Sequence, residues 1–136
     1  MMVLDTNIVL DVLVFNDPAT APLKQALAAR KPQWIATKPM RDELERVLAY
    51  PKIAARLAFY QLTCAQVLAQ LDGMAQMVDV ASKAVVTCRD PDDQKFIDLA
   101  VAHRARLLSK DRDVLCMKKR LLALDVLAQP AINFVA

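Results

Sequence analysis

Acidic side chains recur at the ends of apolar segments, and this placement is the main chemical feature of the sequence. Residues 85–93 run from an apolar pair into a cluster of three acids that ends at Asp93, and a second apolar run at 107–109 leads to Asp111. Between them, residues 94–104 carry apolar side chains at helical spacing. Ligands of open parallel sheets bind beyond the carboxyl ends of the strands. The pattern therefore predicts that Asp93 and Asp111 lie where a reaction would take place.

Two further carboxylates fit the same pattern. Asp5 follows the apolar residues 2–4, which predict a buried first strand. Glu43 lies beside the apolar face of a helix that is expected to begin after a second strand at 34–36. Asp5 could instead only cap the following helix, and Glu43 could simply pair with an arginine. With right-handed crossovers between parallel strands, all four acids would share one rim of the sheet.

Four carboxylates at one rim would repel one another unless a cation lay among them. Oxygen ligands without nearby histidine or cysteine suit Mg²⁺ or Mn²⁺ better than zinc. Such a site can activate water and stabilise charge on a phosphodiester. Basic residues close to the acids in the sequence could hold a polyanionic backbone; they are Lys38, Arg41, Arg89, Lys95, Lys110 and Arg112.

The composition narrows the possible classes of protein. The 136 residues, 56% hydrophobic and 24% charged, are expected to form one globular domain over 1–136. A single histidine and a single glycine argue against histidine-based zinc sites, catalytic triads and glycine-rich phosphate loops. No apolar run reaches the roughly 18–20 residues of a membrane span, so no membrane association is expected. Three widely spaced cysteines fit a cytoplasmic protein, and the net charge of +3 permits a polyanionic partner.

The remaining segments alternate between strand and helix, which predicts a parallel sheet with helices on both faces. A third strand is expected at 77–81, and a last strand within 121–127. Two helices at 53–60 and 64–76, the second interrupted by Gly73, are expected to form an antiparallel pair over one edge of the sheet. Their apolar faces could also supply a homodimer interface, because periodicity alone does not separate an interface from a core.

Taken together, these motifs resemble those of PIN-domain ribonucleases. The resemblance covers nearly the whole chain and rests on the segments 3–7, 37–44, 47–52, 89–96 and 107–113. It is closest to stand-alone bacterial and archaeal PIN proteins that are described as toxins of toxin–antitoxin pairs, akin to VapC. The resemblance implies a three-layer α/β/α sandwich with a central parallel β-sheet. It also implies Mg²⁺- or Mn²⁺-dependent cleavage of single-stranded RNA, with an antitoxin protein as a partner.

The resemblance assigns roles to the four acids. By position, Asp5, Glu43, Asp93 and Asp111 match the acidic quartet of the family. The three aspartates would bind the metal, and Glu43 would complete its shell or position the attacking water. The cluster at 90–93 leaves the identity of the third ligand open. We favour Asp93 because its eighteen-residue separation from Asp111 suits one helix, a turn and a strand.

Other polar positions near the acids also compare with the family. Asn7 and Ser109 match its supporting polar positions, although threonine is common where Ser109 stands. Lys110 replaces a small residue, and it could compete with a metal for the acids or hold the phosphate. The side chains that we expect to contact RNA are Lys38, Arg41, Lys95, Lys110 and Arg112.

Two other functions fit parts of the sequence. A PIN-like interaction module could keep the acidic rim without turnover and bind a protein or RNA partner, for example a partner that inserts an arginine or lysine. An aspartate-based phosphotransfer domain also has an acid at a strand end. It would have further acids beside Asp5, where Thr6 and Asn7 stand instead.

Overall fold

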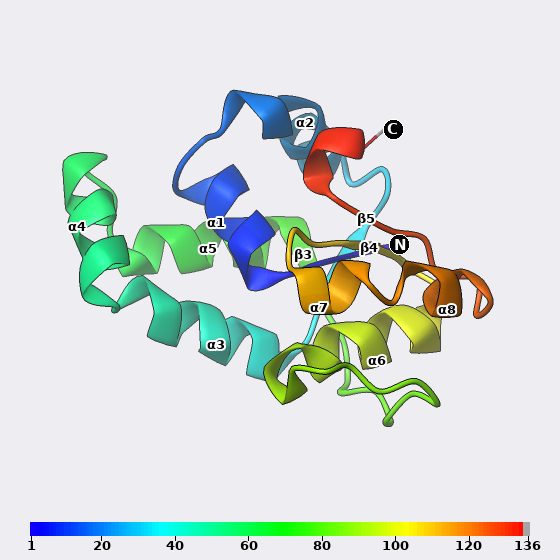
Figure 1. Cartoon of the computed structure of the whole chain (residues 1–136). Coiled ribbons are helices and arrows are strands. Elements are labelled where there is room, and N and C mark those ends of the chain that lie inside the picture. Colours follow the sequence, from blue (N-terminus) through cyan, green and yellow to red (C-terminus); the bar gives the residue numbers. More distant parts are fainter. Residues whose placement is uncertain (135–136) are drawn as a thin grey trace.

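A five-stranded sheet, parallel throughout, forms the centre of the molecule in the computed structural model, which describes residues 1–134 (Figure 1). Its order is β3-β2-β1-β4-β5, so the first strand of the chain is the middle strand of the sheet. The strands are β1 (Met2–Leu4), β2 (Trp34–Ala36), β3 (Ala75–Met77), β4 (Arg106–Leu108) and β5 (Ala128–Gln129). All three residues of β1 are buried, as expected for a strand that is covered on both faces.

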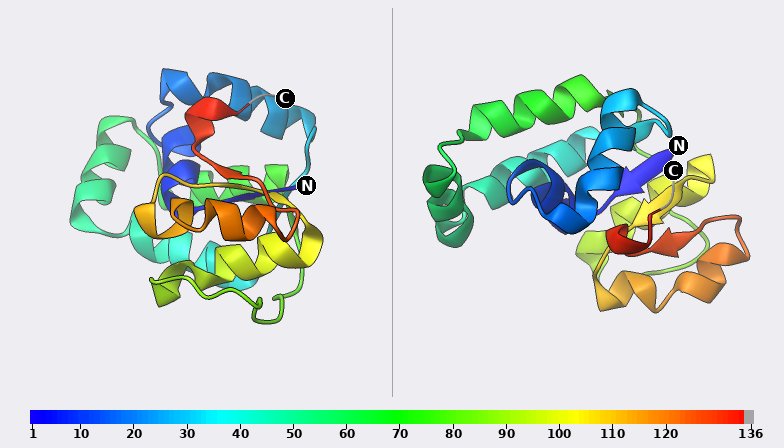
Figure 2. Two further views of the ribbon diagram at one scale, coloured as in Figure 1. Left: turned by 45° about the vertical axis from the view of Figure 1, so that its right-hand side comes forward. Right: turned by 90° about the horizontal axis from the view of Figure 1, so that it is seen from above.

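Helices cover both faces of this sheet, which confirms the predicted three-layer sandwich. The helices α1 (Thr6–Leu13) and α2 (Ala21–Ala29) lie on one face, as Figures 1 and 2 show. The opposite face is covered by α6 (Gln94–His103), with α7 (Arg112–Leu115) and α8 (Lys118–Leu122) beside it. Short 3-10 turns complete the chain: η1 (Pro18–Thr20), η2 (Pro91–Asp93) and η3 (Ala131–Asn133).

Three further helices form an arm that extends away from the sheet (Figures 1 and 2). They are α3 (Lys38–Leu48), α4 (Pro51–Phe59) and α5 (Cys64–Met74). The expected pairing of the last two is wrong: α3 packs against α5, and α4 lies at the outer end. The reason is the width of the apolar faces, because α3 and α5 each bury three side chains whereas α4 buries only Leu57.

Two predicted strands lie elsewhere in the structure. The third strand is β3, and Gly73 lies inside α5 without interrupting it. Since β2 is only three residues long, it pairs with three residues of β3 and leaves 78–81 outside the sheet. The last strand is β5, because α8 and the turn after it occupy most of 121–127; Val126 closes that turn by donating its amide to Leu121, and Asp125 adopts a φ of 64°.

The pairing register brings polar residues of the two central strands together at the carboxyl rim. Leu4 of β1 pairs with Leu108 of β4, so Asp5 and Ser109 leave the sheet side by side. The backbone amide of Asp5 donates to the carbonyl of Leu108 at 3.0 Å, which fixes this register one residue beyond the strand. No helix of the described chain is long and apolar enough to cross a membrane.

Candidate metal centre

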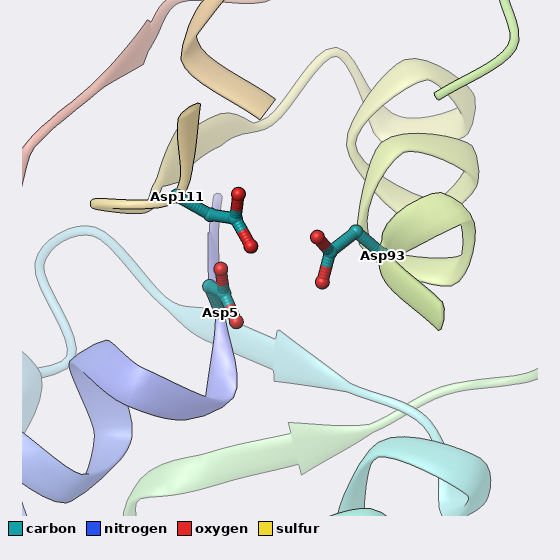
Figure 3. Close-up of side chains that lie close together, drawn as sticks. All are labelled: Asp5, Asp93 and Asp111. Atoms are coloured by element: carbon teal, nitrogen blue, oxygen red, sulfur yellow. The ribbon is translucent and has the colours of Figure 1, made fainter. Parts of the chain in front are cut away.

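Three aspartates from distant parts of the chain converge at this rim. Asp5, Asp93 and Asp111 each place a carboxylate oxygen within 4.8 Å of the other two. Figure 3 shows the three carboxylates turned toward one another. Asp5 directly follows β1, Asp93 ends η2 immediately before α6, and Asp111 directly precedes α7. The convergence therefore depends on the sheet and on the starts of two helices.

Ser109 connects two members of this acidic trio. Its fully buried hydroxyl donates to Asp5 Oδ2 at 2.7 Å and accepts from the backbone amide of Asp111 at 3.0 Å. Asn7, the other expected supporting residue, has an exposed side chain. Its backbone amide, however, forms a hydrogen bond with the Asp5 carboxylate, which opposes the rise of the Asp5 pKa. The polar support of Asp5 thus comes from one side-chain hydroxyl and one backbone amide.

The cluster at 90–93 divides into residues with separate roles. Asp90 caps η2 by accepting from the backbone amide of Asp92 at 3.0 Å, and Asp92 is exposed. Asp93 is buried and faces the other two aspartates. Asp111 caps α7 by accepting from the amide of Asp113 at 2.9 Å. Local helix capping therefore explains Asp90 and one oxygen of Asp111, but it does not explain the burial of Asp93.

The electrostatics of the trio favour a cation. The pKa of Asp93 is raised to about 8, most strongly by burial and also by a hydrogen bond with Asp111 and the charges of Asp5, Asp111 and Asp90. Burial also raises the pKa of Asp5, although the Ser109 hydroxyl opposes that effect. Asp93 Oδ2 is buried and has no hydrogen-bond partner among the described residues. A buried acceptor without a partner is costly, and an ion between the three carboxylates would satisfy it.

Glu43 lies near this trio but has partners of its own. Thr6 donates its hydroxyl to Glu43 Oε2, and Lys95 donates its ammonium to Glu43 Oε1 at 2.8 Å. The Glu43 and Lys95 side chains are only 19% and 23% exposed, so this is a half-buried ion pair. Its charge still contributes to the raised pKa of Asp5, after the larger effect of burial. The fourth acid therefore has an internal counter-ion, whereas none of the three aspartates forms an ion pair with another described residue.

Most of the basic side chains that were expected to contact RNA form ion pairs in this structure. Besides Lys95, Lys38 pairs with Asp42 at 2.9 Å and Arg41 pairs with Asp72 at 2.9 Å. Arg112 is exposed. Lys110 pairs with Asp11, to whose Oδ2 it donates at 2.8 Å. The partners of Arg41 and Lys110 are distant in the sequence, since Asp72 lies on α5 and Asp11 on α1.

Two residues at this rim were missed by the reasoning from sequence. Thr6 was considered only as a helix start, and nothing in its neighbourhood indicates a contact with Glu43 on α3. Asp11 did carry a signal, because it is an acid inside the otherwise apolar helix α1. An acid that is buried on such a helix needs a partner, and Lys110 provides it.

Comparison with known protein families shows which family has this arrangement of acids. The sequence profile of the PIN domain matches residues 1–113, a segment that contains all four rim acids. The chain belongs to the PIN domain family. A search of curated proteins gives no match.

The fold of this PIN domain is similar to that of a chain in a solved complex. That structure is described as the crystal structure of VapBC2 from Rickettsia felis bound to a DNA fragment from their promoter. The TM-score is 0.63, and the alignment covers 95% of this chain and 97% of that chain. The sequence identity is 13%, so the likeness concerns the fold.

We predict that the metal-free protein loses stability as the pH rises from about 4 to about 8. The folded protein keeps the Asp93 proton up to a pKa of about 8, whereas the unfolded chain releases it near the ordinary value of 3.8. Between these values the folded state binds more protons, so the free energy of unfolding falls with rising pH. Urea denaturation in EDTA at about pH 5 and about pH 8.5 measures this change.

The variant Asp93→Asn lacks the titrating group and is expected to weaken this pH dependence. It should also be more stable than wild type at the higher pH. Asp125→Asn removes an exposed carboxylate before β5, at the opposite rim, and serves as the matched control. A wild-type stability that is constant or rises over this range would show that Asp93 is not held protonated in the folded state.

Proposed function

We propose that this PIN domain is a Mg²⁺- or Mn²⁺-dependent endoribonuclease that cleaves single-stranded RNA. The observation that supports the proposal most is the trio of carboxylates, two of them buried, in which Asp93 Oδ2 has no partner within the described chain. Asp5, Asp93 and Asp111 would hold the ion. A ligand set made only of carboxylates suits Mg²⁺ or Mn²⁺, whereas zinc favours nitrogen and sulfur ligands. The bound ion would supply activation of water and stabilisation of phosphodiester charge.

Glu43 would orient the attacking water. Both of its oxygens are fixed, one by Thr6 and one by Lys95, so its carboxylate is held in a defined position beside the trio. Groups that are fixed in advance lose little freedom when the substrate binds. Lys95 balances the charge of the Glu43 carboxylate and also donates to the carbonyl of Asp92, so it would present its one remaining ammonium proton toward a phosphate.

The exposed basic side chains would hold the RNA backbone. Lys38 is 81% exposed and its partner Asp42 is 42% exposed, so their ion pair contributes little to stability. Such pairs can exchange a carboxylate for a phosphate at small cost. We therefore infer that Lys38, Arg41 and Arg112 contact phosphates, and that binding weakens as salt is added.

We further propose that the protein is the toxin of a toxin–antitoxin pair. The structure with the similar fold is described as a VapBC2 complex with promoter DNA, which supports a second protein as partner. The outer end of the arm exposes Tyr50, Phe59 and Tyr60, which are 56%, 79% and 37% exposed. Aromatic residues are enriched at interfaces, so an antitoxin or a second copy in a homodimer would cover this end. An RNA substrate and three free cysteines fit a cytoplasmic location.

A non-catalytic PIN-like interaction module is the alternative. It is favoured by one observation: Lys95 already neutralises Glu43, so that three of the four rim acids lack a counter-ion among the described residues. Such a module would bind a protein or RNA partner without turnover. It would bind that partner equally well in EDTA. A nuclease assay measures cleavage, so this binding requires a separate measurement.

We predict that cleavage of a mixed-sequence single-stranded RNA requires Mn²⁺ or Mg²⁺ and stops in EDTA. Asp93→Asn should lower the rate by at least about a hundredfold, because loss even of groups that only support a metal ligand costs 10–100-fold. The control Asp90→Asn keeps the cap of η2, since asparagine caps helices as well as aspartate does. Its rate should stay within a few-fold of wild type.

Three results would contradict this assignment. Equal cleavage by wild type and Asp93→Asn would mean that a contaminant or a different acid is responsible. Loss of cleavage in Asp90→Asn with retention in Asp93→Asn would move the third ligand to Asp90. Cleavage by neither variant nor wild type, together with partner binding in EDTA, would favour the interaction module.

We predict a separate effect for Thr6→Val, which removes the hydroxyl that fixes Glu43 but preserves side-chain shape. The cleavage rate should fall roughly tenfold, as is usual for groups that orient a functional carboxylate. The Kd for Mn²⁺ should change by less than about threefold, because Thr6 contacts none of the three aspartates through its side chain. Single-turnover cleavage and calorimetry measure the two quantities. A large loss of Mn²⁺ affinity would show that Glu43 belongs to the metal's ligands.

A further inference from the structure

A second polar site lies beside the aspartate trio, in the cavity between α1, η1 and the segment that follows β5. We propose that this cavity binds a guanine base of the RNA through the Asp11–Lys110 ion pair and so gives the enzyme a base preference. The inference rests on the proposed ribonuclease function, since it names a feature of that same substrate.

The cavity borders the rim where the aspartates converge. It has a volume of about 180 Å³, and its lining includes Ile8, Thr20, Lys110 and Ala131. Ile8 is three residues after Asp5 on α1, and Lys110 directly precedes Asp111. A base in the cavity would therefore belong to a nucleotide close to the phosphodiester held at the trio.

The size of the cavity suits one ring of a base. An apolar cavity of about 150 Å³ is known to hold a benzene ring, so about 180 Å³ accommodates a six-membered ring with its polar edge. A whole nucleotide would not fit. Ile8, Pro130 and Ala131 supply apolar surface for the ring, while the sugar and phosphate would stay outside at the rim.

The polar edge of the cavity is formed by Asp11 and Lys110. The Asp11 side chain is only 12% exposed, and its Oδ2 accepts from Lys110 Nζ at 2.8 Å. No donor in the described part of the chain bonds to its second oxygen, Oδ1. Asp17 also lines the cavity, but one of its oxygens caps η1 by accepting from the amide of Ala19. The row from Lys110 Nζ through Asp11 Oδ2 to Oδ1 therefore reads donor, acceptor, acceptor.

Guanine is the base whose Watson–Crick edge complements this row. Its edge presents O6, N1–H and N2–H in order, which is acceptor, donor, donor. Uracil would place O2 against the free carboxylate oxygen, and cytosine would place N3 and O2 against the carboxylate. Adenine would place its acceptor N1 against the carboxylate and satisfies at most one of the three positions. Single-stranded RNA exposes these edges because its bases can leave the stack.

The lysine at position 110, which replaces the small residue expected there, would thus bind the base. A lysine that reached into the trio would compete with a cation there, but Lys110 is bonded to Asp11 on α1. The lysine ammonium keeps two protons after its bond to Asp11. One of them is available to the O6 of a bound guanine.

Binding of short labelled RNAs tests this site without cleavage. Fluorescence anisotropy in EDTA would compare uridine oligoribonucleotides that differ only in the central base, which is guanine, adenine, cytosine or uracil. The guanine oligonucleotide should bind the wild-type protein roughly tenfold more tightly than the all-uridine one, in line with the discrimination that a bidentate base contact gives.

Asp11→Asn and Lys110→Met should each reduce this guanine preference to about twofold or less. Asp125→Asn, which removes a carboxylate at the opposite rim, should retain the full preference. Thermal unfolding of each variant shows whether it is folded. Because the Lys110 side chain is 52% exposed, it can remain solvated when Asp11 is neutralised.

Several outcomes would overturn the guanine site. They are equal affinities for the four oligonucleotides, a guanine preference that survives in a folded Asp11→Asn protein, and no binding of any oligonucleotide. The proposed function fails separately, since a guanine preference without metal-dependent cleavage would reject the nuclease and keep the base site. Metal-dependent cleavage without a base preference would reject the base site and keep the nuclease.

Discussion

The close approach of three carboxylates, two of them buried, is the physical constraint on which the interpretation of this PIN domain depends. Asp5 and Asp93 are removed from water, and both have raised pKa values, chiefly because of burial. The surrounding chain offsets this cost only in part, through Ser109 for Asp5 and a helix cap for Asp111. Asp93 receives no such compensation on Oδ2 from the described residues. The aspartate trio therefore lowers the stability of the folded chain, as is common for functional sites.

Glu43, the fourth acid, has its charge balanced within the protein, and we therefore assign it a different role from that of the three aspartates. Glu43 has a hydroxyl on one oxygen and an ammonium on the other, so it is neutralised without a metal. The trio and Glu43 are thus adjacent but electrostatically distinct. This arrangement favours a single cation held by three aspartates, with a glutamate fixed beside it, over four equivalent ligands. A second pair, Asp11 with Lys110, adds polar groups to a neighbouring cavity and leaves the trio free of lysine.

The central part of the fold could be predicted from sequence because its strands are buried on both faces. Continuous apolar runs mark β1, β2 and most of β4, and acids directly after β1 and near β4 mark the rim. The edge strands were misplaced, since β3 and β5 are set by where their short neighbours end. Polar and apolar residues alternate too weakly in these two strands to predict where each strand begins and ends.

The partners of the site residues depend on tertiary contacts that no local pattern contains. Thr6 and Glu43 are 37 residues apart, and Lys95 and Glu43 are 52 residues apart. Spacing could favour Asp93 over its neighbours, because η2 and α6 form a local unit in which Asp90 caps and Asp93 turns inward. It could not show that Lys110 avoids the aspartates, since that depends on Asp11, 99 residues earlier in the chain.

Calorimetric titration of the metal-free protein with Mn²⁺ tests the central claim most directly. Wild type would be compared with Asp93→Asn, and Asp90→Asn would control for the loss of a negative charge in the same turn. We predict about one ion per chain for wild type and for Asp90→Asn, and loss of that binding in Asp93→Asn. A wild-type protein that binds no Mn²⁺, or an Asp93→Asn protein that binds it with unchanged affinity, would contradict a metal site formed by the three aspartates.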